Sequence, residues 1–271
     1  MISHKLTNTN PRSHGITLCV LASGSRGNAI YISDHNTSIL IDAGLSGIEI
    51  QRRMESRGID PKQIDAIVVS HEHRDHIQGV GILARRFGLT VYMSEDTCKA
   101  AAPIVGKVEN IQHFECGTGF SIGQLFLHPF SVSHDSVDPA GFTVKTSSAK
   151  IGIATDLGIA TAMVKTHLKN CNSLILEANH DPAMLENGPY PWPLKQRVQG
   201  RSGHLSNHAS KNLLREIEHH NLTHIVLAHL SETNNTPEKA LAEVSGAITL
   251  CNPDISVARQ EECGELLHVT T

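Results

Sequence analysis

The segment SHEHRDHI at residues 70–77 places three histidines and two carboxylates within six positions. Neutral imidazoles and carboxylates are suitable ligands for divalent ions such as Zn²⁺, Mn²⁺ and Fe²⁺. In a tight loop, His71 and His73 can face one point, while Asp75 and His76 face a second point close by. One loop cannot complete two coordination spheres. The pattern therefore predicts that other segments supply further ligands.

Three other segments offer such ligands at the ends of apolar runs. FSVSH ends in His134, KIGIATD ends in Asp156 and THIVLAH ends in His229, while the loop at 70–77 itself follows the β-rich run DAIVVS. Ligand sites in α/β sheets favour the carboxyl ends of strands. A single histidine at a strand end is usually an ordinary polar residue. Four strand ends that each deliver a donor to one edge indicate a metal site.

The elements needed to position these donors are visible as short apolar runs and helical patterns. Helical patterns are expected at 46–57, 77–87, 159–168, 206–219 and 237–250, the last with Thr236 as N-cap and Pro237 at its first position. Many strands with helices to cover them predict an α/β fold in which two packed sheets are flanked by helices. Strands are expected at 16–22, 29–33, 37–43, 65–70, 89–94, 125–134, 141–146, 150–155, 173–178, 223–228, 255–259 and 265–269.

Composition restricts the function classes. The chain has 271 residues and a formal net charge of −4, which does not indicate a globally basic nucleic-acid binder but permits a local basic patch. No apolar run reaches the length of a membrane span. Residues 1–14 are polar, without the apolar region of a secretory signal, and are expected to form a flexible tail before a single domain at 15–271. Six scattered cysteines without a CxxC pair suggest reduced thiols in a cytoplasmic protein.

The motif HxHxDH at 71–76, followed by single His, Asp and His residues at strand ends, resembles the metallo-β-lactamase fold. The resemblance covers residues 16 to 270 and implies an αβ/βα four-layer sandwich of two mixed sheets with two divalent metal ions at the sheet edge. Zn²⁺ and Mn²⁺ both suit the donors, and Fe²⁺ is possible. Asp42, at the end of TSILID, matches the acidic residue that orients a ligand from beneath the metal loop. By motif, the resemblance assigns one ion to His71, His73 and His134, the other to Asp75, His76 and His229, and the bridging position to Asp156.

Further motifs resemble the YycJ/WalJ-like branch of this family. They are LASGSRGNAIYI, LEANHD, GPYP, LK-x-R, GHLSN and LAHLS-x-x-NN, in this order along the chain. The resemblance implies a metal-dependent phosphodiesterase, with DNA exonuclease activity attributed to the branch.

Two ions held close together can share a hydroxide nucleophile and stabilise the oxygens of an in-line displacement. Asp75 is a candidate to orient that nucleophile. His204 is a candidate general acid or phosphate contact, although it could merely cap the helix expected to begin near Ser206 or Asn207. The glycine-containing stretch at 22–28 could approach an anion or could be only a hairpin turn. The predicted substrate contacts are Ser25, Asn28, Lys195, Arg197, Arg201 and Asn207.

The metal ligands alone do not decide the substrate. A thioesterase or lactonase of the glyoxalase II type would use the same ligands, but has less need of the basic residues at 195–201. A β-lactamase is not expected, because Asp156 stands where those enzymes usually have cysteine. Only 72 residues separate Asp156 from His229, which leaves no room for an inserted nucleic-acid domain, so binding to DNA should be modest and salt-sensitive. A non-catalytic metal-binding module is not expected either, since a structural site closes with four donors. The native metal, the choice among DNA, RNA and a small phosphodiester, and the oligomeric state stay open.

Overall fold

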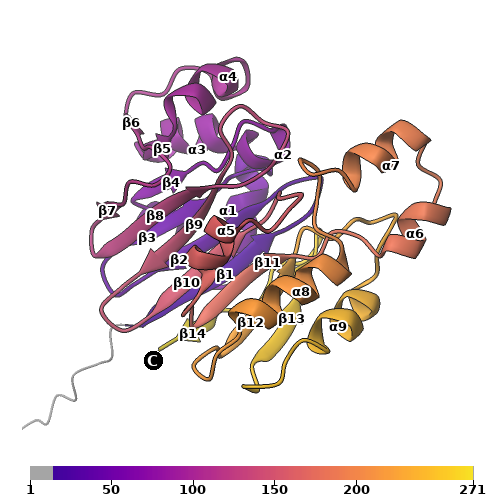
Figure 1. The fold of residues 1–271 in the computed structure, drawn as a ribbon. Helices are drawn as coiled ribbons and strands as arrows, with labels where there is room; N and C mark the ends of the chain where they lie inside the picture. The colour runs from indigo at the N-terminus through magenta and orange to yellow at the C-terminus, as the bar shows by residue number, and fades with distance from the viewer. Residues whose placement is uncertain (1–14, 271) are drawn as a thin grey trace, which may run out of the picture.

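Two seven-stranded β-sheets pack face to face in the computed structural model, which describes residues 15–270 (Figure 1). The predicted tail at 1–14 lies outside the described residues. The first sheet combines antiparallel pairing at its β14–β1–β2–β3 side with parallel pairing from β3 to β6. In spatial order its strands are β14 (Leu267–Val269), β1 (Ile16–Ala22), β2 (Ala29–Ser33), β3 (Ser38–Ile41), β4 (Ala66–Val68), β5 (Thr90–Met93) and β6 (Ile111–His113).

The second sheet has the same mixed arrangement. Its strands β10 to β13 pair in parallel, and β7 to β10 pair antiparallel. In spatial order they are β13 (Asp254–Val257), β12 (His224–Ala228), β11 (Ser173–Glu177), β10 (Lys150–Ala154), β9 (Ala140–Lys145), β8 (Leu125–Ser131) and β7 (Phe120–Ile122).

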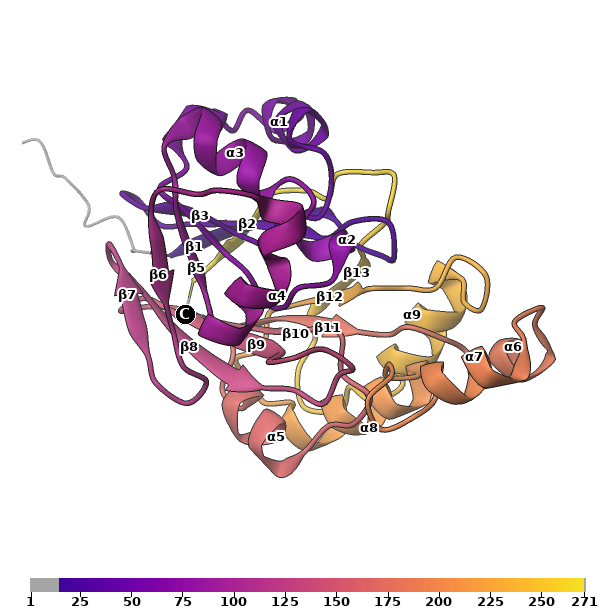
Figure 2. The same ribbon diagram turned by 90° about the horizontal axis from the view of Figure 1, so that it is seen from above.

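Helices cover the outer face of each sheet, so the molecule has four layers (Figure 2). The first sheet is covered by α1 (Gly47–Ser56), α3 (Val80–Phe87) and α4 (Glu95–Val105), and the second by α5 (Ala162–Leu168), α8 (Asn207–Ile217) and α9 (Pro237–Ser245). This confirms the predicted αβ/βα sandwich of two mixed sheets. The remaining helices are the short α2 (Arg74–Ile77), the 3₁₀ turn η1 (Pro61–Gln63), α6 (Pro182–Asn187) and α7 (Trp192–Val198).

The strands read as continuous apolar runs because both faces of each sheet are buried. In β1, Leu18 and Val20 point into the core between the sheets, while Cys19 and Leu21 pack against the helices of the first sheet. The alternation follows the two-residue period of a strand. Each sheet therefore buries one face against the other sheet and one face against helices.

The helix starts follow the expected capping chemistry. The side chain of Thr236 accepts a hydrogen bond from the backbone N–H of Lys239, with Pro237 at the first position of α9. The Ser206 side chain caps α8 in the same way, and Gly88 ends α3 in the left-handed conformation. In residues 15–270, no helix has both the length and the apolar character needed to cross a bilayer.

The helices α6 and α7 project from the body beside the carboxyl ends of the second sheet's strands (Figure 1). None of the seven α7 residues is buried. The segment that contains α6 and α7 rejoins the body at Gly203, and His204 follows just before α8. It thus places α7 near the edge at which the predicted donors emerge.

Candidate metal centre

The predicted donors emerge from the carboxyl ends of five strands. Asp42 follows β3, the 71–76 loop follows β4, His134 follows β8, Asp156 follows β10 and His229 follows β12. Asp42, Asp156 and His229 have positive φ angles of 61°, 56° and 56°. Only one other non-glycine residue in the described part of the chain does so. Such backbone conformations are uncommon and concentrate at functional sites, because the surrounding structure must hold them.

The first predicted trio converges. His71, His73 and His134 each offer a ring nitrogen, and these atoms lie within 4.8 Å of one another. Nε2 of His134 is 3.2 Å from Nδ1 of His73. Ligand atoms bound to one tetrahedral zinc ion lie about 3.4 Å apart, given bonds of 2.0–2.1 Å. The spacing of the three nitrogens is therefore compatible with a shared ion.

The second predicted trio converges beside the first. Oδ2 of Asp75 lies 3.6 Å from Nε2 of His76 and 3.7 Å from Nε2 of His229. Asp156 lies between the trios: Oδ2 is 3.4 Å from His76, and Oδ1 is 3.3 Å from His229 and 3.9 Å from Nε2 of His134. All seven predicted donors are thus gathered at one point of the sheet edge.

Unpartnered buried atoms show that these residues fit a metal ion. Nε2 of His71, Nε2 of His229 and Oδ2 of Asp156 are buried without a hydrogen-bond partner. A buried polar group without a partner costs about 1–3 kcal/mol. Three such atoms in one cluster would be compensated together by a cation. The donor set, imidazoles with carboxylates, suits a divalent ion of the zinc or manganese type.

Asp42 supports the cluster from behind. Its Oδ2 accepts a hydrogen bond from Nδ1 of His76 at 2.7 Å, and its carboxylate also accepts from the backbone N–H and the hydroxyl of Ser70. When Nδ1 of His76 donates to Asp42, Nε2 keeps its lone pair for the cluster. The contact is the one expected for a residue that orients a metal ligand.

Glu177, the last residue of β11, is a site residue that the sequence analysis missed. It is fully buried, and its Oε2 accepts hydrogen bonds from the backbone N–H groups of Leu157 and Leu205 at 3.0 Å each. Its Oε1 lies 2.7 Å from Nδ1 of His204 and 3.4 Å from Nδ1 of His229. Glu177 therefore orients two histidines of the site at once.

The imidazoles nearest the carboxylates carry raised pKa values. Burial alone would lower the pKa of His76, but the carboxylates of Asp42 and Asp156 outweigh burial and raise this pKa to about 9. Burial also opposes a charge on His229, and Asp156 and Asp75 raise its pKa well above the usual value. These histidines thus balance the buried carboxylates with protons, which a bound cation would replace.

In the first trio, by contrast, the pKa values of two histidines are lowered. Burial lowers the pKa of His71 well below its usual value, and the neighbouring imidazoles of His76 and His134 lower it further. Burial likewise lowers the pKa of His134. Neutral imidazole is the form that binds a metal ion, so these two ring nitrogens need no deprotonation at neutral pH.

The glycine-containing loop at 23–28 braces the metal loop. The backbone N–H of Asn28 donates to the carbonyl of Asp75 at 2.7 Å, and the Asn28 side chain lies 3.2 Å from Oδ2 of Asp75 and 3.1 Å from Nε2 of His76. Asn28 is buried, so it contacts the donors themselves. Of the two interpretations of this loop, a turn that positions the donors describes Asn28 better than an anion contact.

Close packing at Gly44 leads to a prediction. A Cβ atom at Gly44 would lie 1.6 Å from the Asp75 carbonyl oxygen and 2.7 Å from the Asn28 backbone nitrogen. We expect Gly44→Ala to displace the metal loop, to lower stability by about 1–3 kcal/mol, and to reduce metal content in atomic absorption measurements. Gly246→Ala is the control, because its Cβ would meet nothing closer than 3.4 Å. A Gly44→Ala protein with the metal content and melting temperature of the control would contradict this account.

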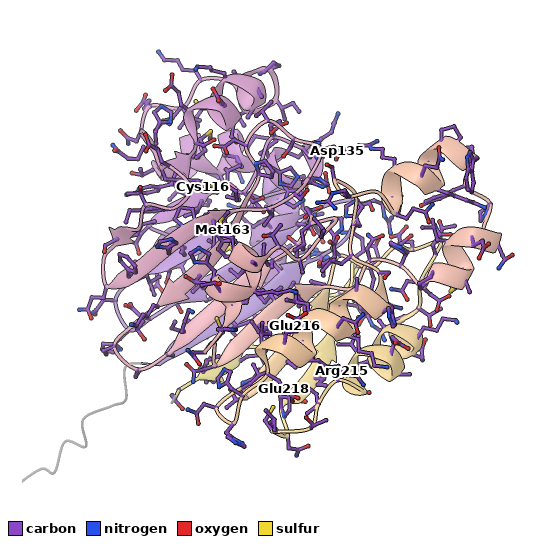
Figure 3. All side chains as sticks on the ribbon, in the orientation of Figure 1. Cys116, Asp135, Met163, Arg215, Glu216 and Glu218 are labelled. Atoms are coloured by element: carbon purple, nitrogen blue, oxygen red, sulfur yellow. The ribbon has the colours of Figure 1, made fainter. Side chains whose placement is uncertain are left out.

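A pocket of about 260 Å³ opens beside the donor cluster. Of the residues predicted to contact substrate or its phosphate, Ser25, Arg197 and His204 line this pocket. Arg197 pairs with Asp135 at 2.6 Å, which joins α7 to the loop after β8, and Figure 3 shows Asp135 on the side of the body that faces α7. The pocket lining also includes Asn179 and Gly203, which belong to the motifs LEANHD and GHLSN. It further includes residues to which the sequence analysis gave no role, namely Asp135, Tyr190, Leu194, Val198 and Ser231.

Four of the six predicted substrate contacts, Asn28 among them, do not line this pocket. Lys195 donates to the backbone carbonyl of Glu186, and Arg201 is exposed outside the lining. Asn207 is buried at the start of α8 and exchanges hydrogen bonds with Asn235. The structure therefore brings only Arg197 of the three basic residues into the pocket lining.

Comparison with known proteins identifies relatives along most of the chain. The family model described as Beta-lactamase superfamily domain matches residues 37–230. The exodeoxyribonuclease YycJ of Bacillus anthracis is 35% identical over 233 residues, which are 85% of this chain and 88% of the relative. The exodeoxyribonuclease WalJ of Streptococcus pneumoniae is 36% identical over 247 residues, 90% of this chain and 91% of the relative.

Solved structures agree on the fold. The metallo-β-lactamase fold protein YhfI from Bacillus subtilis matches 94% of this chain and 99% of its own with a TM-score of 0.73 at 16% identity. A diphosphatase from the PhnP family matches 95% of this chain and 99% of its own with a TM-score of 0.67 at 16% identity. At sequence identities this low, the similarity shows only that the fold is shared. The sequence relatives and the family model together show that the chain belongs to the β-lactamase superfamily, with the metallo-β-lactamase fold.

Proposed function

We propose that this protein is a metal-dependent hydrolase of phosphodiester bonds that acts as a DNA exonuclease. The observation that carries the proposal is the pocket in which the donor cluster lies together with His204 and Arg197. A hydrolase of phosphodiesters needs an activated water, a group for the leaving oxygen and a group for the phosphate charge. The pocket offers candidates for all three.

Two ions are the occupancy that the donors support best. His71, His73 and His134 would hold one ion, Asp75, His76 and His229 the other, and Asp156 would bridge them. Zn²⁺ and Mn²⁺ suit this donor set, and Fe²⁺ is possible. When bound, divalent ions supply Lewis acidity, which lowers the pKa of a water molecule and stabilises charge on the phosphate oxygens.

The protein side chains orient the reactants. Asp75 has Oδ2 near both His76 and His229, so its carboxylate can also accept a hydrogen bond from the attacking water and orient it. His204 donates from Nδ1 to Glu177, which leaves Nε2 free for the substrate. Burial opposes a charge on His204, but the Glu177 carboxylate raises its pKa. A protonated His204 can donate to the leaving oxygen as a general acid.

The names of the sequence relatives favour DNA over other substrates. Both curated relatives described above carry the name exodeoxyribonuclease and align over about nine-tenths of their length. Arg197 supplies a cation for phosphate, although its pairing with Asp135 means that substrate must compete for it. Neither relative supports the thioesterase or lactonase alternative. A cytoplasmic location stays a prediction outside this proposal.

The test is hydrolysis by the full chain reconstituted in parallel with Zn²⁺ and Mn²⁺. End-labelled single-stranded and duplex DNA should lose nucleotides stepwise from an end, and bis-p-nitrophenyl phosphate should also be cleaved. EDTA should abolish both reactions, and added metal should restore them. If a thioester or lactone were hydrolysed while both phosphodiesters stayed intact, the proposed substrate class would be wrong.

A general-acid role for His204 gives a specific expectation. His204→Ala should lower kcat on DNA by about 10²-fold or more while metal content stays at the wild-type level. His208→Ala is the matched control, because His208 is an exposed histidine on α8 that pairs only with Glu243. A substrate with an activated p-nitrophenolate leaving group should be much less sensitive to His204→Ala. Equal losses on both substrates would instead indicate that His204 is a phosphate contact or a packing residue and not the general acid.

A further inference from the structure

The pocket beside the donor cluster has apolar lining in addition to its polar groups. Tyr190, Leu194 and Val198 line it, together with the donors and Arg197. Leu194 and Val198 are four residues apart on α7, so both lie on one face of the helix. The preceding segment supplies Tyr190. One small pocket thus combines an aromatic and aliphatic surface with cation-binding and phosphate-binding groups.

The apolar face of α7 is not part of the protein core. No residue of α7 is buried, and Leu194 and Val198 are only half-buried, whereas the neighbouring α8 buries Leu213 and Leu214 against the second sheet. An apolar surface gains hydrophobic free energy only when something covers it. In this structure the pocket lies over that face, so a ligand in the pocket would cover it.

We propose that Tyr190, Leu194 and Val198 bind the base of a terminal nucleotide whose phosphate lies at the donor cluster. The inference rests on the proposed exonuclease function and adds a base-binding site to it. Among phosphate compounds, a nucleotide has the required chemistry, because a flat apolar base is joined to an anionic group. Stacking of bases on aromatic side chains is common in proteins that bind single strands.

The dimensions and charges of the pocket agree with this occupant. A volume of about 260 Å³ is slightly below the usual range of small-ligand sites, which starts near 300 Å³. It therefore suits one nucleotide rather than a stretch of duplex. Arg197 and the ions that the donor cluster would hold complement the phosphate, while Leu194 and Val198 carry no group that could read base edges. Binding should accordingly depend on the presence of a base and only weakly on its identity.

The affinities of two product-like compounds distinguish the contribution of the base from that of the phosphate. Isothermal titration of the zinc-loaded full chain with thymidine 5′-monophosphate and with 2-deoxyribose 5-phosphate requires no turnover. We expect the nucleotide to bind about tenfold more tightly, the scale of one stacked base. Tyr190→Ala should weaken nucleotide binding by about that factor and leave binding of the sugar phosphate unchanged. Tyr190→Phe should retain most of the preference.

Trp192 provides the matched control. It is an aromatic residue on α7, 62% exposed and outside the pocket lining, so Trp192→Ala should leave both affinities unchanged. Equal affinities of the wild type for the two compounds would overturn the base site. So would a Tyr190→Ala protein that loses affinity for both compounds to the same extent. If the nucleotide is preferred but DNA is not cleaved, the base site stands and the exonuclease proposal fails. If DNA is cleaved without the preference, only the base site fails.

Discussion

Asp156→Asn is expected to abolish DNA hydrolysis, with a loss of at least ~10³-fold in kcat/KM. Oδ1 of Asp156 lies 3.3 Å from His229 and Oδ2 lies 3.4 Å from His76, so each oxygen faces a different part of the donor cluster. Asparagine keeps the shape and one carbonyl oxygen, but replaces the other oxygen with an N–H₂ group that cannot bind a cation. The bridging role should therefore disappear while packing is preserved.

Metal analysis distinguishes this account from simple unfolding. We expect the Asp156→Asn protein to bind fewer than two ions per chain by atomic absorption, with a far-UV circular dichroism spectrum like that of the wild type. Asp96→Asn is the control, because Asp96 is exposed on α4 and pairs only with Lys99. Full metal content together with undiminished hydrolysis in Asp156→Asn would remove Asp156 from the centre and, with it, the two-ion arrangement.

Most strands and most donors could be predicted because their signals are local, although the three-residue strands β6 and β7 were not predicted. A strand buried on both faces is a continuous apolar run, and the first polar donor after the run must lie at the sheet edge. His134, Asp156 and His229 each follow such a run directly. The helices α4, α6 and α7 could not be found in this way. The helix α4 contains Pro103, and the face that it buries consists of small residues and Val105, which give a weak apolar pattern. The helices α6 and α7 are short and bury almost no apolar face, so they lack the periodic pattern of an amphipathic helix.

The substrate contacts were harder to predict because their directions depend on tertiary structure. Lys195 and Arg197 are near each other in sequence, but residues two apart on a helix point in different directions. Arg197 consequently lines the pocket, while Lys195 bonds to the backbone of Glu186. Asn207 turns inward at the start of α8 to Asn235, a partner 28 residues away. Residues that are close in sequence therefore point to different places in the folded chain.

Glu177 could in principle have been found from its burial. It ends SLILE, a run whose five residues are all buried in β11. An ionised carboxylate at the end of a buried strand is costly unless it is paired and hydrogen-bonded, so the sequence predicts buried partners for this carboxylate. Those partners, His204 and His229, are 27 and 52 residues away, and only the folded chain brings them to its carboxylate.

Glu177→Gln should damage the site by changing histidine tautomers. The carbonyl oxygen of the glutamine can still accept from Leu157 and Leu205, which directs its N–H₂ group at Nδ1 of His204 and His229. Each Nδ1 must then accept rather than donate a hydrogen bond, so the proton moves to Nε2. In His229 that nitrogen is the one that faces Asp75 and Asp156, and a protonated Nε2 cannot bind a metal ion.

We therefore expect Glu177→Gln to weaken metal binding by about 10–100-fold, the usual cost of losing a group that orients a ligand. Hydrolysis at limiting metal should fall by at least the same factor. Saturating metal should restore only part of the activity, because Nδ1 of His204 also loses the carboxylate to which it donates. Competition with a chromophoric chelator measures the affinity directly. Glu216→Gln is the control, since Glu216 is an exposed residue of α8 paired with Lys165. Wild-type affinity in Glu177→Gln would show that the hydrogen bonds from His204 and His229 do not set the tautomers, and that Glu177 stabilises only the backbone around β11.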